Sequence, residues 1–129
     1  MMSLHKIPVI WVLVADAHTA RIFKRQGEGL EFIAGMKPTF HYKSPANDPA
    51  HDSKAEVGFA HEIALWLDHA VRDKSYDRLV MIAAPRMLGD LRKCLSEQVQ
   101  NRVVAEVDKD LTKMPEAELK LELTKVVWF

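Results

Sequence analysis

The stretch WVLVADAHTARIFKR, residues 11–25, decides the fold of this chain. It begins inside a continuous apolar run, residues 9–15, whose β-branched side chains are typical of a strand buried on both faces. Residues 20–25 then alternate between apolar and polar side chains, which predicts a second strand. The turn between the two runs is too short for a crossover, so the strands are expected to pair antiparallel. Asp16 and His18 stand in this turn.

The chain continues with a third strand and then with a long irregular segment. Residues 30–36 form the third strand, after the turn QGEG. Residues 37–52 hold three of the six prolines, and proline disfavours both a helix interior and a central strand. Ser53 and Glu56 have the spacing of a capping box, so a helix is expected from Ser53 to near Asp73.

The second half of the chain alternates between strands and helices. Residues 78–84 and 103–107 are apolar runs that predict two more strands. Pro85 suits the first turn of a helix whose apolar stripe continues to Val99, and a last helix is expected from near Pro115. The predicted order is therefore three strands followed by helix, strand, helix, strand and helix.

The order of these elements predicts an α/β fold. Right-handed crossovers make the fourth and fifth strands parallel to the first. We expect a single domain, residues 1–129, with a five-stranded mixed sheet of order 3-2-1-4-5 and helices on both faces, as in the ribonuclease H fold. The carboxyl ends of the three parallel strands then meet at one edge, where open α/β sheets bind ligands. The residues that follow these ends are Asp16 and His18, then Pro85 and Arg86, then Asp108, Lys109 and Asp110.

Composition and charge are typical of a soluble globular protein. Hydrophobic residues make up 48% of the chain and charged residues 28%. Lysine plus arginine and aspartate plus glutamate both number 18, so the basic excess of proteins that grip long nucleic acid is absent and RNA binding would need a local patch. The single cysteine, Cys94, excludes a disulfide within the chain and favours the cytoplasm. No segment is apolar for long enough to span a bilayer.

Asp16 and Asp110 are the candidate catalytic residues. Nucleases that use magnesium hold their ions between several carboxylates at one point, and these two are expected at the same edge of the sheet. Asp90 lies more than a turn into a helix and is expected to point elsewhere, so neither a metal site nor a cofactor is predicted. The chain also lacks a Gly-x-Ser-x-Gly motif and a phosphate-cradling glycine loop.

Arg86, with His18 and Lys109, is the candidate site for an anion or another ligand. A guanidinium beside the free N–H groups of a helix start can hold a phosphate or carboxylate. Arg86 could equally pair with Asp16 or Asp110 and simply close the edge of the sheet.

The irregular segment, residues 37–52, is a candidate surface for RNA or a partner. His41, Tyr42 and Lys43 place basic and aromatic groups side by side, and His51 stands near its end. Such groups stack on bases and pair with phosphates. The histidines match no compact zinc spacing. The apolar last residues, VVWF, either complete the core or dock on a second subunit to form a homo-oligomer.

Three segments resemble a known family. WVLVADAHTARIF, LVMIAAPRMLGDLRKCL and EVDKDLTKMPEAEL are similar, in this order, to bacterial host-attachment proteins, described as proteins required for attachment to host cells. That family is in turn similar to bacterial relatives of the middle domain of archaeal and eukaryotic peptide-chain release factors, which implies a ribonuclease-H-like fold. The Gly-Gly-Gln tripeptide of the release factors is absent here, so the resemblance does not imply their ester hydrolysis.

Three functions follow from these observations. The first is a small cytoplasmic binding domain that engages RNA or the ribosome through residues 37–52 and the Arg86 edge, with an indirect effect on attachment. The second is a hydrolase or nuclease-like enzyme that uses Asp16, Arg86 and Asp110 on a phosphate-bearing or acyl substrate. The third is an interaction protein that acts directly in surface attachment.

Overall fold

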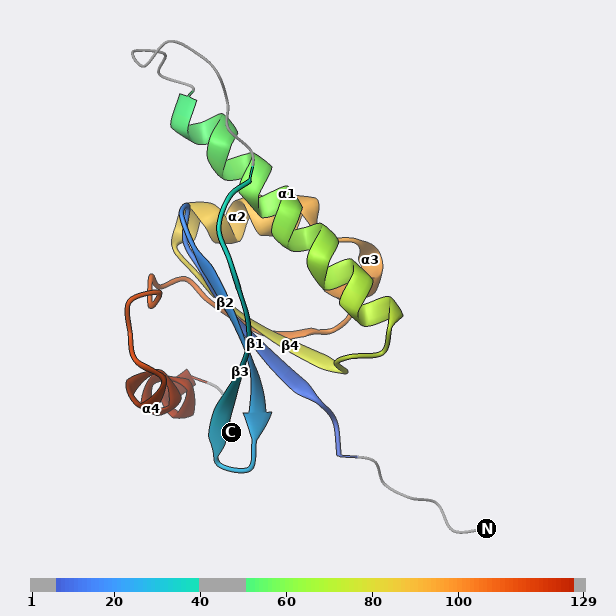
Figure 1. Ribbon diagram of the computed structural model, residues 1–129, viewed down its shortest axis with the longest axis vertical. Coiled ribbons are helices and arrows are strands. Elements are labelled where there is room, and N and C mark those ends of the chain that lie inside the picture. Colours follow the sequence, from blue (N-terminus) through green and yellow to red (C-terminus); the bar gives the residue numbers. More distant parts are fainter. Residues whose placement is uncertain (1–6, 40–50, 127–129) are drawn as a thin grey trace.

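A five-stranded mixed sheet forms the centre of the structure, a computed structural model that describes residues 7–39 and 51–126, with the backbone alone for 51–55 and 126 (Figure 1). The strands are β1 (Ile10–Ala15), β2 (Ala20–Gln26), β3 (Gly29–Met36), β4 (Arg78–Ala83) and β5 (Val103–Val107). Their order is β3-β2-β1-β4-β5. The β1–β2 and β2–β3 pairs are antiparallel, and the β1–β4 and β4–β5 pairs are parallel. The predicted α/β fold and strand order are confirmed.

Helices cover both faces of this sheet. They are α1 (His51–Arg72), α2 (Pro85–Cys94), α3 (Glu97–Gln100) and α4 (Glu116–Val126). Figure 1 shows α1, α2 and α3 on one side of the strands and α4 on the other. The sheet is therefore the middle layer of three, and each of its faces has a separate apolar core.

The apolar run of β1 explains why two cores form. Successive side chains of a strand point to opposite faces, so a strand in the middle of three layers must be apolar throughout. Trp11 and Leu13 pack against α1 and α2, whereas Val12 and Val14 face the core that includes Leu119 of α4. All five of these side chains are buried. The prediction that this strand is buried on both faces is confirmed.

One expected helix is divided into two. The apolar stripe predicted one helix from Pro85 through Val99, but α2 ends at Cys94 and the short α3 begins at Glu97. Ser96 causes the break: its backbone is extended, and its hydroxyl accepts a hydrogen bond from the Val99 backbone N–H at 3.2 Å. The same hydroxyl donates to Asp68 Oδ1 at 2.7 Å, which fixes the break to α1.

The predicted capping box of α1 is also wrong. The helix begins at His51, so Ser53 is a helical residue and cannot act as the cap. Glu56 is buried rather than folded back on the helix start, and its carboxylate lies 3.8 Å from the Nε atom of Arg86 on α2. A contact between two helices has replaced the local contact that the spacing suggested.

Candidate functional site

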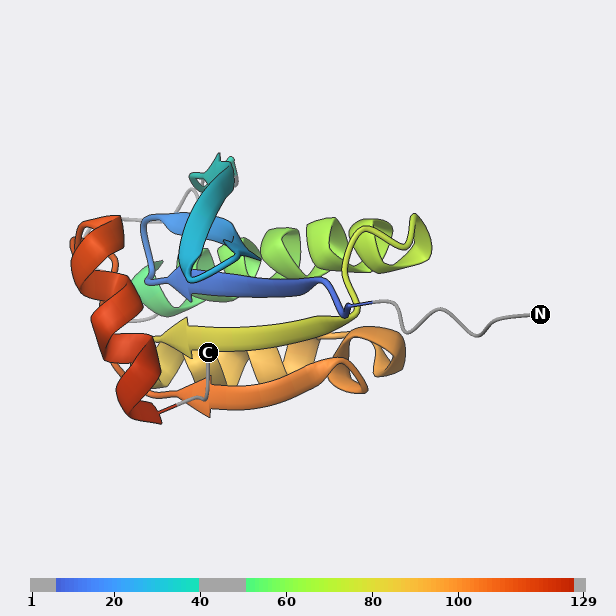
Figure 2. The ribbon, with the colours of Figure 1, turned by 90° about the horizontal axis from the view of Figure 1, so that it is seen from below.

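The ends of β1, β4 and β5 lie at one edge of the sheet, as their arrowheads in Figure 2 show. The register pairs Ala15 with Ala83 and Ile82 with Val107, so the three strands end level with one another. We call the residues that directly follow these ends the rim: 16–19, 84–86 and 108–112. The rim carries two polar clusters.

The first cluster explains the acidic residue in the β1–β2 turn. Asp16 Oδ1 accepts hydrogen bonds from the backbone N–H groups of His18 and Thr19, both at 2.8 Å. This is the local bonding that makes aspartate a common turn residue. Asp16 Oδ2 accepts a third hydrogen bond, at 2.9 Å, from the hydroxyl of Thr112, 96 residues along the chain.

Asp110 meets Asp16 at the same hydroxyl. Its Oδ1 atom lies 2.6 Å from Thr112 Oγ1 and also accepts from the Thr112 backbone N–H at 3.2 Å. A hydroxyl has one proton, so Thr112 donates to one of the two carboxylates at a time. Thr112 is buried. The structure therefore brings Asp16 and Asp110 together at Thr112, and the hydrogen bond between Thr112 and Asp16 fastens the segment after β5 to the β1–β2 turn.

The second cluster surrounds the start of α2. Arg86 is the second residue of this helix, and 58% of its side chain is exposed. Its ion pair is with Glu56, and at 3.8 Å this contact is loose. Ala84 stands at the N-cap position, where no side chain caps the helix and no acidic residue occupies the first turn. The first N–H groups of α2 therefore face the rim beside an exposed guanidinium.

Glu56 and Asp90 form a carboxyl pair behind Arg86. Burial raises the pKa of Glu56 above its ordinary value, and the charge and side-chain hydrogen bond of Asp90 raise it further, against the lowering effect of Arg86 and His18. The Oδ2 atom of Asp90 is buried and has no hydrogen-bonding partner among the described residues. Two adjacent carboxyl groups form a hydrogen bond only when one holds a proton. The Glu56 carboxyl therefore keeps its proton to a higher pH than an exposed glutamate does.

The raised pKa of Glu56 predicts how stability depends on pH. The unfolded chain ionises this carboxyl at its ordinary pKa and the folded chain does so only at higher pH, so stability falls as pH rises through the folded pKa. We expect Glu56→Gln, which keeps a donor for Asp90, to be more stable than the original chain at about pH 8, with a smaller difference at about pH 4. Urea unfolding at both pH values measures this. A pH-independent difference would contradict it.

The remaining predicted site residues are dispersed or lie outside the described residues. His18 and Lys109 are exposed at the rim. Asp90 does not join Asp16 and Asp110 but faces Glu56. His41, Tyr42 and Lys43, with the rest of residues 40–50, lie outside the described residues, as does the side chain of His51 at the start of α1. The predicted subunit contact VVWF, residues 126–129, lies outside them too, apart from the backbone of residue 126.

Glu56 was missed because its spacing from Ser53 suggested a cap. A second signal was available, since Glu56 stands three residues before Phe59 and seven before Ile63, on the apolar stripe of α1. Phe59 and Ile63 are fully buried, and Glu56 is buried beside them. A carboxylate on an apolar stripe requires a polar partner inside the protein, and that partner is the start of α2.

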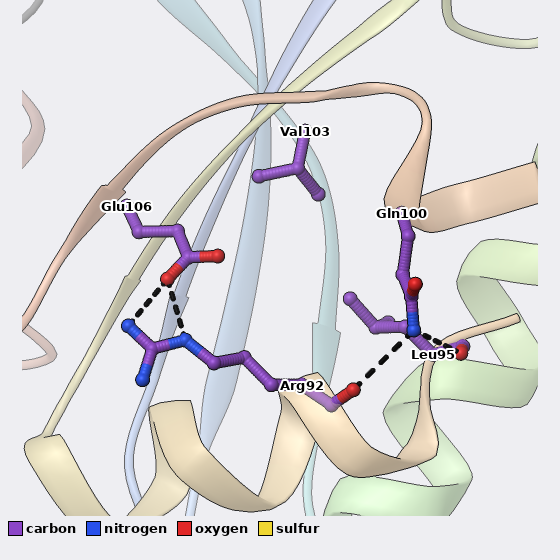
Figure 3. Close-up of a pocket in the computed structure, with 5 residues that line it drawn as sticks. All are labelled: Arg92, Leu95, Gln100, Val103 and Glu106. Carbon is purple, nitrogen blue, oxygen red and sulfur yellow. Dashed lines mark hydrogen bonds and ion pairs between the residues drawn. The ribbon is translucent and has the colours of Figure 1, made fainter. Parts of the chain in front are cut away.

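A pocket of about 260 Å³ lies between α2, α3 and β5 (Figure 3). Its polar groups bond to one another: Arg92 contacts Glu106 Oε1 through Nε at 2.7 Å and through Nη2 at 2.5 Å. The Gln100 amide donates to the carbonyl of Leu95 at 3.0 Å and to that of Arg92 at 3.4 Å. With its charged groups paired in this way, the pocket offers a ligand less than the rim does.

Neither a cluster of metal ligands nor a membrane-spanning helix is present among the described residues. In the part of the chain that the structure describes, no group of three or more histidine, cysteine, aspartate or glutamate residues is placed to hold a metal ion. Within the same residues, no helix has the length and apolar character needed to cross a membrane.

Comparison with known proteins gives one family and two distant folds. A family model described as "Protein required for attachment to host cells" matches residues 34–123. The structure of an archaeal protein is similar over 92% of this chain and 34% of its own, with a TM-score of 0.54 and 14% identity. The Ppx/GppA phosphatase of Aquifex aeolicus has a TM-score of 0.46 and 13% identity over 78% of this chain and 35% of its own. At such identities the likeness concerns the fold alone.

This chain thus spans about a third of the length of the two solved proteins that it resembles. Among curated protein sequences, none matches it.

Proposed function

The chain belongs to the family of proteins required for attachment to host cells, and we propose that it serves attachment indirectly, as a cytoplasmic domain that binds the phosphate groups of RNA. The similarity of this family to bacterial relatives of release-factor middle domains, which the sequence resemblance implies, points to RNA of the translation machinery, with the ribosome as the place of action. Phosphate groups bind at the rim, in the second cluster.

The main support for RNA binding is the exposed, loosely paired arginine at the uncapped start of α2. Arg86 is exposed there, its only ion pair among the described residues is loose, and the helix has no side-chain cap. A phosphate at this point would accept hydrogen bonds from a guanidinium and from backbone N–H groups, and it would lie at the positive end of the helix dipole. His18, exposed in the neighbouring turn, supplies a further donor.

The carboxyl pair beside Arg86 sets the charge of this site. Two ionised carboxylates would repel a phosphate, but the raised pKa of Glu56 means that its negative charge is suppressed. Arg86 therefore lies near a carboxyl group that ionises less readily than an ordinary glutamate, which leaves more of the charge of Arg86 available to a ligand. The protein has zero net charge, so attraction to RNA must come from such local groups.

Replacing Arg86 tests the proposal. With a labelled single-stranded RNA followed by fluorescence anisotropy, we expect Arg86→Ala to bind about tenfold more weakly, the equivalent of about 1.4 kcal/mol. The plot of log affinity against log salt should also become shallower by about one. Arg92→Ala is the matched control, because Arg92 is on the same helix, is 57% exposed and is paired with Glu106.

Three outcomes would contradict the proposal: no RNA binding even at low salt, equal losses in the two variants, or failure of the protein to sediment with ribosomes at low salt. Recovery of the protein from the surface of intact cells would instead favour direct attachment.

An enzyme is the second candidate, and the carboxyl pair favours it. A protonated carboxyl beside an arginine can donate a proton to a leaving group whose charge the arginine stabilises. This function would use Glu56 and Asp90 rather than Asp16 and Asp110, whose oxygens are engaged with Thr112 and the turn. Cleavage of the RNA by the original chain but not by Glu56→Gln would support the enzyme over simple binding.

A further inference from the structure

A groove of about 520 Å³ lies between the end of β3 and α1. Its apolar walls are Met36 from the strand and Leu65 and Trp66 from the helix. The indole of Trp66 stacks on the buried Trp11 with ring centroids 5.5 Å apart, so this wall is fixed to the core. Leu65 is 49% exposed, so part of its apolar surface is free to contact an occupant of the groove.

The strand wall of the groove is the edge of the sheet. β3 pairs with β2 alone, and no other described residue forms a backbone hydrogen bond with it. A strand edge of this kind is a template for another strand unless charges or bulges protect it. In β3 only the first half of the strand has such protection. This half carries the charged Glu31, and it ends in a bulge at which Ile33 has no partner on β2. After the bulge, Ala34 to Met36 carry no charge, and this unprotected half borders the groove.

The polar groups of the groove select the charge of an occupant. Among the described residues that line the groove, the one carboxylate is that of Glu62, and it accepts hydrogen bonds from the backbone N–H of Thr39 at 3.1 Å and from the Thr39 hydroxyl. Lys37 on the strand side and His69 on the helix side are both exposed. Each wall therefore presents a basic group, which favours an acidic residue in the occupant.

We propose that the open half of β3 and this groove together bind an extended peptide segment of a partner protein, apolar at its centre and acidic at its ends. The peptide adds a strand to β3 through main-chain hydrogen bonds. Its central apolar side chains, which alternate along the strand, enter the groove between Met36 and Trp66. Its acidic ends reach Lys37 and His69.

This site is independent of the rim. On α1, Glu56 faces α2, whereas Glu62, Leu65, Trp66 and His69 face β3. RNA binding can therefore fail while peptide binding holds, and the reverse is also true.

The test uses the full chain and a blocked hexapeptide of sequence Asp-Val-Thr-Val-Thr-Asp. We expect amide NMR shifts confined to residues 34–39 and the facing turns of α1, together with a change in tryptophan fluorescence. The Leu65→Glu variant should bind this peptide at least about fivefold more weakly. Leu121→Glu is the matched control, since Leu121 is 63% exposed on α4 at the opposite face of the sheet, and it should leave the affinity unchanged. Circular dichroism confirms that both variants fold.

Two further peptides identify the mode of binding. A version with proline at both threonine positions removes two main-chain donors and should not bind, and a version with lysine at both ends should bind more weakly. Shifts scattered over the surface, equal binding of the proline peptide, or no shift at about 1 mM of the first peptide would each overturn the proposal. Shifts that depend on protein concentration without peptide would overturn it in favour of a second copy of the chain.

Discussion

Replacing Phe59 with alanine is expected to lower the free energy of unfolding by about 3–5 kcal/mol. Phe59 is fully buried, and it lies in the core between α1 and the sheet, with Leu13 and Met81 in the same cluster. Alanine would remove most of a ring and leave a cavity that the close-packed neighbours cannot fill. Since domains of this size are stable by about 5–15 kcal/mol, the loss is a large share of the total.

Phe32→Ala is the matched control for this prediction. Phe32 is 51% exposed on β3, where its ring meets Phe23 edge to face with the ring centroids 5.8 Å apart. Its removal should cost about 1 kcal/mol, the value of one aromatic pair. Urea unfolding of the two variants gives both numbers. If the two losses were equal, the core between α1 and the sheet would not be the main support of this fold.

Phe59→Ala is also expected to weaken both proposed binding sites, because both include residues of α1. Glu56 and Leu65 are both on α1, at the rim and in the groove. Both sites therefore depend on how firmly this helix packs on the sheet. In mild urea, Phe59→Ala should lose RNA binding and peptide binding together, whereas Arg86→Ala and Leu65→Glu should each affect one of them.

The strand order could be predicted because it depends on patterns that span whole elements. A run of apolar residues in β1 can be satisfied only in the middle of a layered fold, and the short turns after it allow only antiparallel neighbours. The meeting of Asp16 and Asp110 follows from that order, because both stand just after the ends of parallel strands. Strand direction was sufficient to predict their proximity, although the hydroxyl of Thr112 that joins them gave no sign in the sequence.

The parts that could not be predicted depend on single side chains that have two possible partners. Ser53 had the spacing of a helix cap and does not act as one, whereas Ser96, inside an apolar stripe that suggested an unbroken helix, does. Arg86 could have paired with either aspartate at the rim, yet its partner is Glu56 from another helix. These choices are made by tertiary contacts, which local spacing does not record.

Arg21→Ala is expected to have the second large effect, a loss of about 3 kcal/mol. The Nη2 atom of Arg21 on β2 donates to the carbonyl oxygens of Met114 at 2.7 Å and Leu111 at 3.2 Å. Its guanidinium lies 5.3 Å from the centre of the Phe23 ring. Charge-assisted hydrogen bonds contribute about 1.5–3 kcal/mol each, and a cation–π contact contributes about 0.5–1 kcal/mol. The Nε atom of Arg21 is buried without a partner among the described residues, and the cost of burying it offsets part of this stabilisation.

The same variant should loosen the first cluster of the rim. The carbonyl groups that Arg21 holds belong to the segment that begins after β5 and carries Asp110 and Thr112. In Arg21→Ala we therefore expect faster hydrogen exchange at the Thr112 amide, while the amides of β4 keep their protection. Arg78→Ala, which removes an exposed arginine at the start of β4, should leave both stability and exchange nearly unchanged. Equal losses from the two arginines would mean that Arg21 acts only through its charge, and that the segment after β5 is held in place by Leu119 and its apolar neighbours.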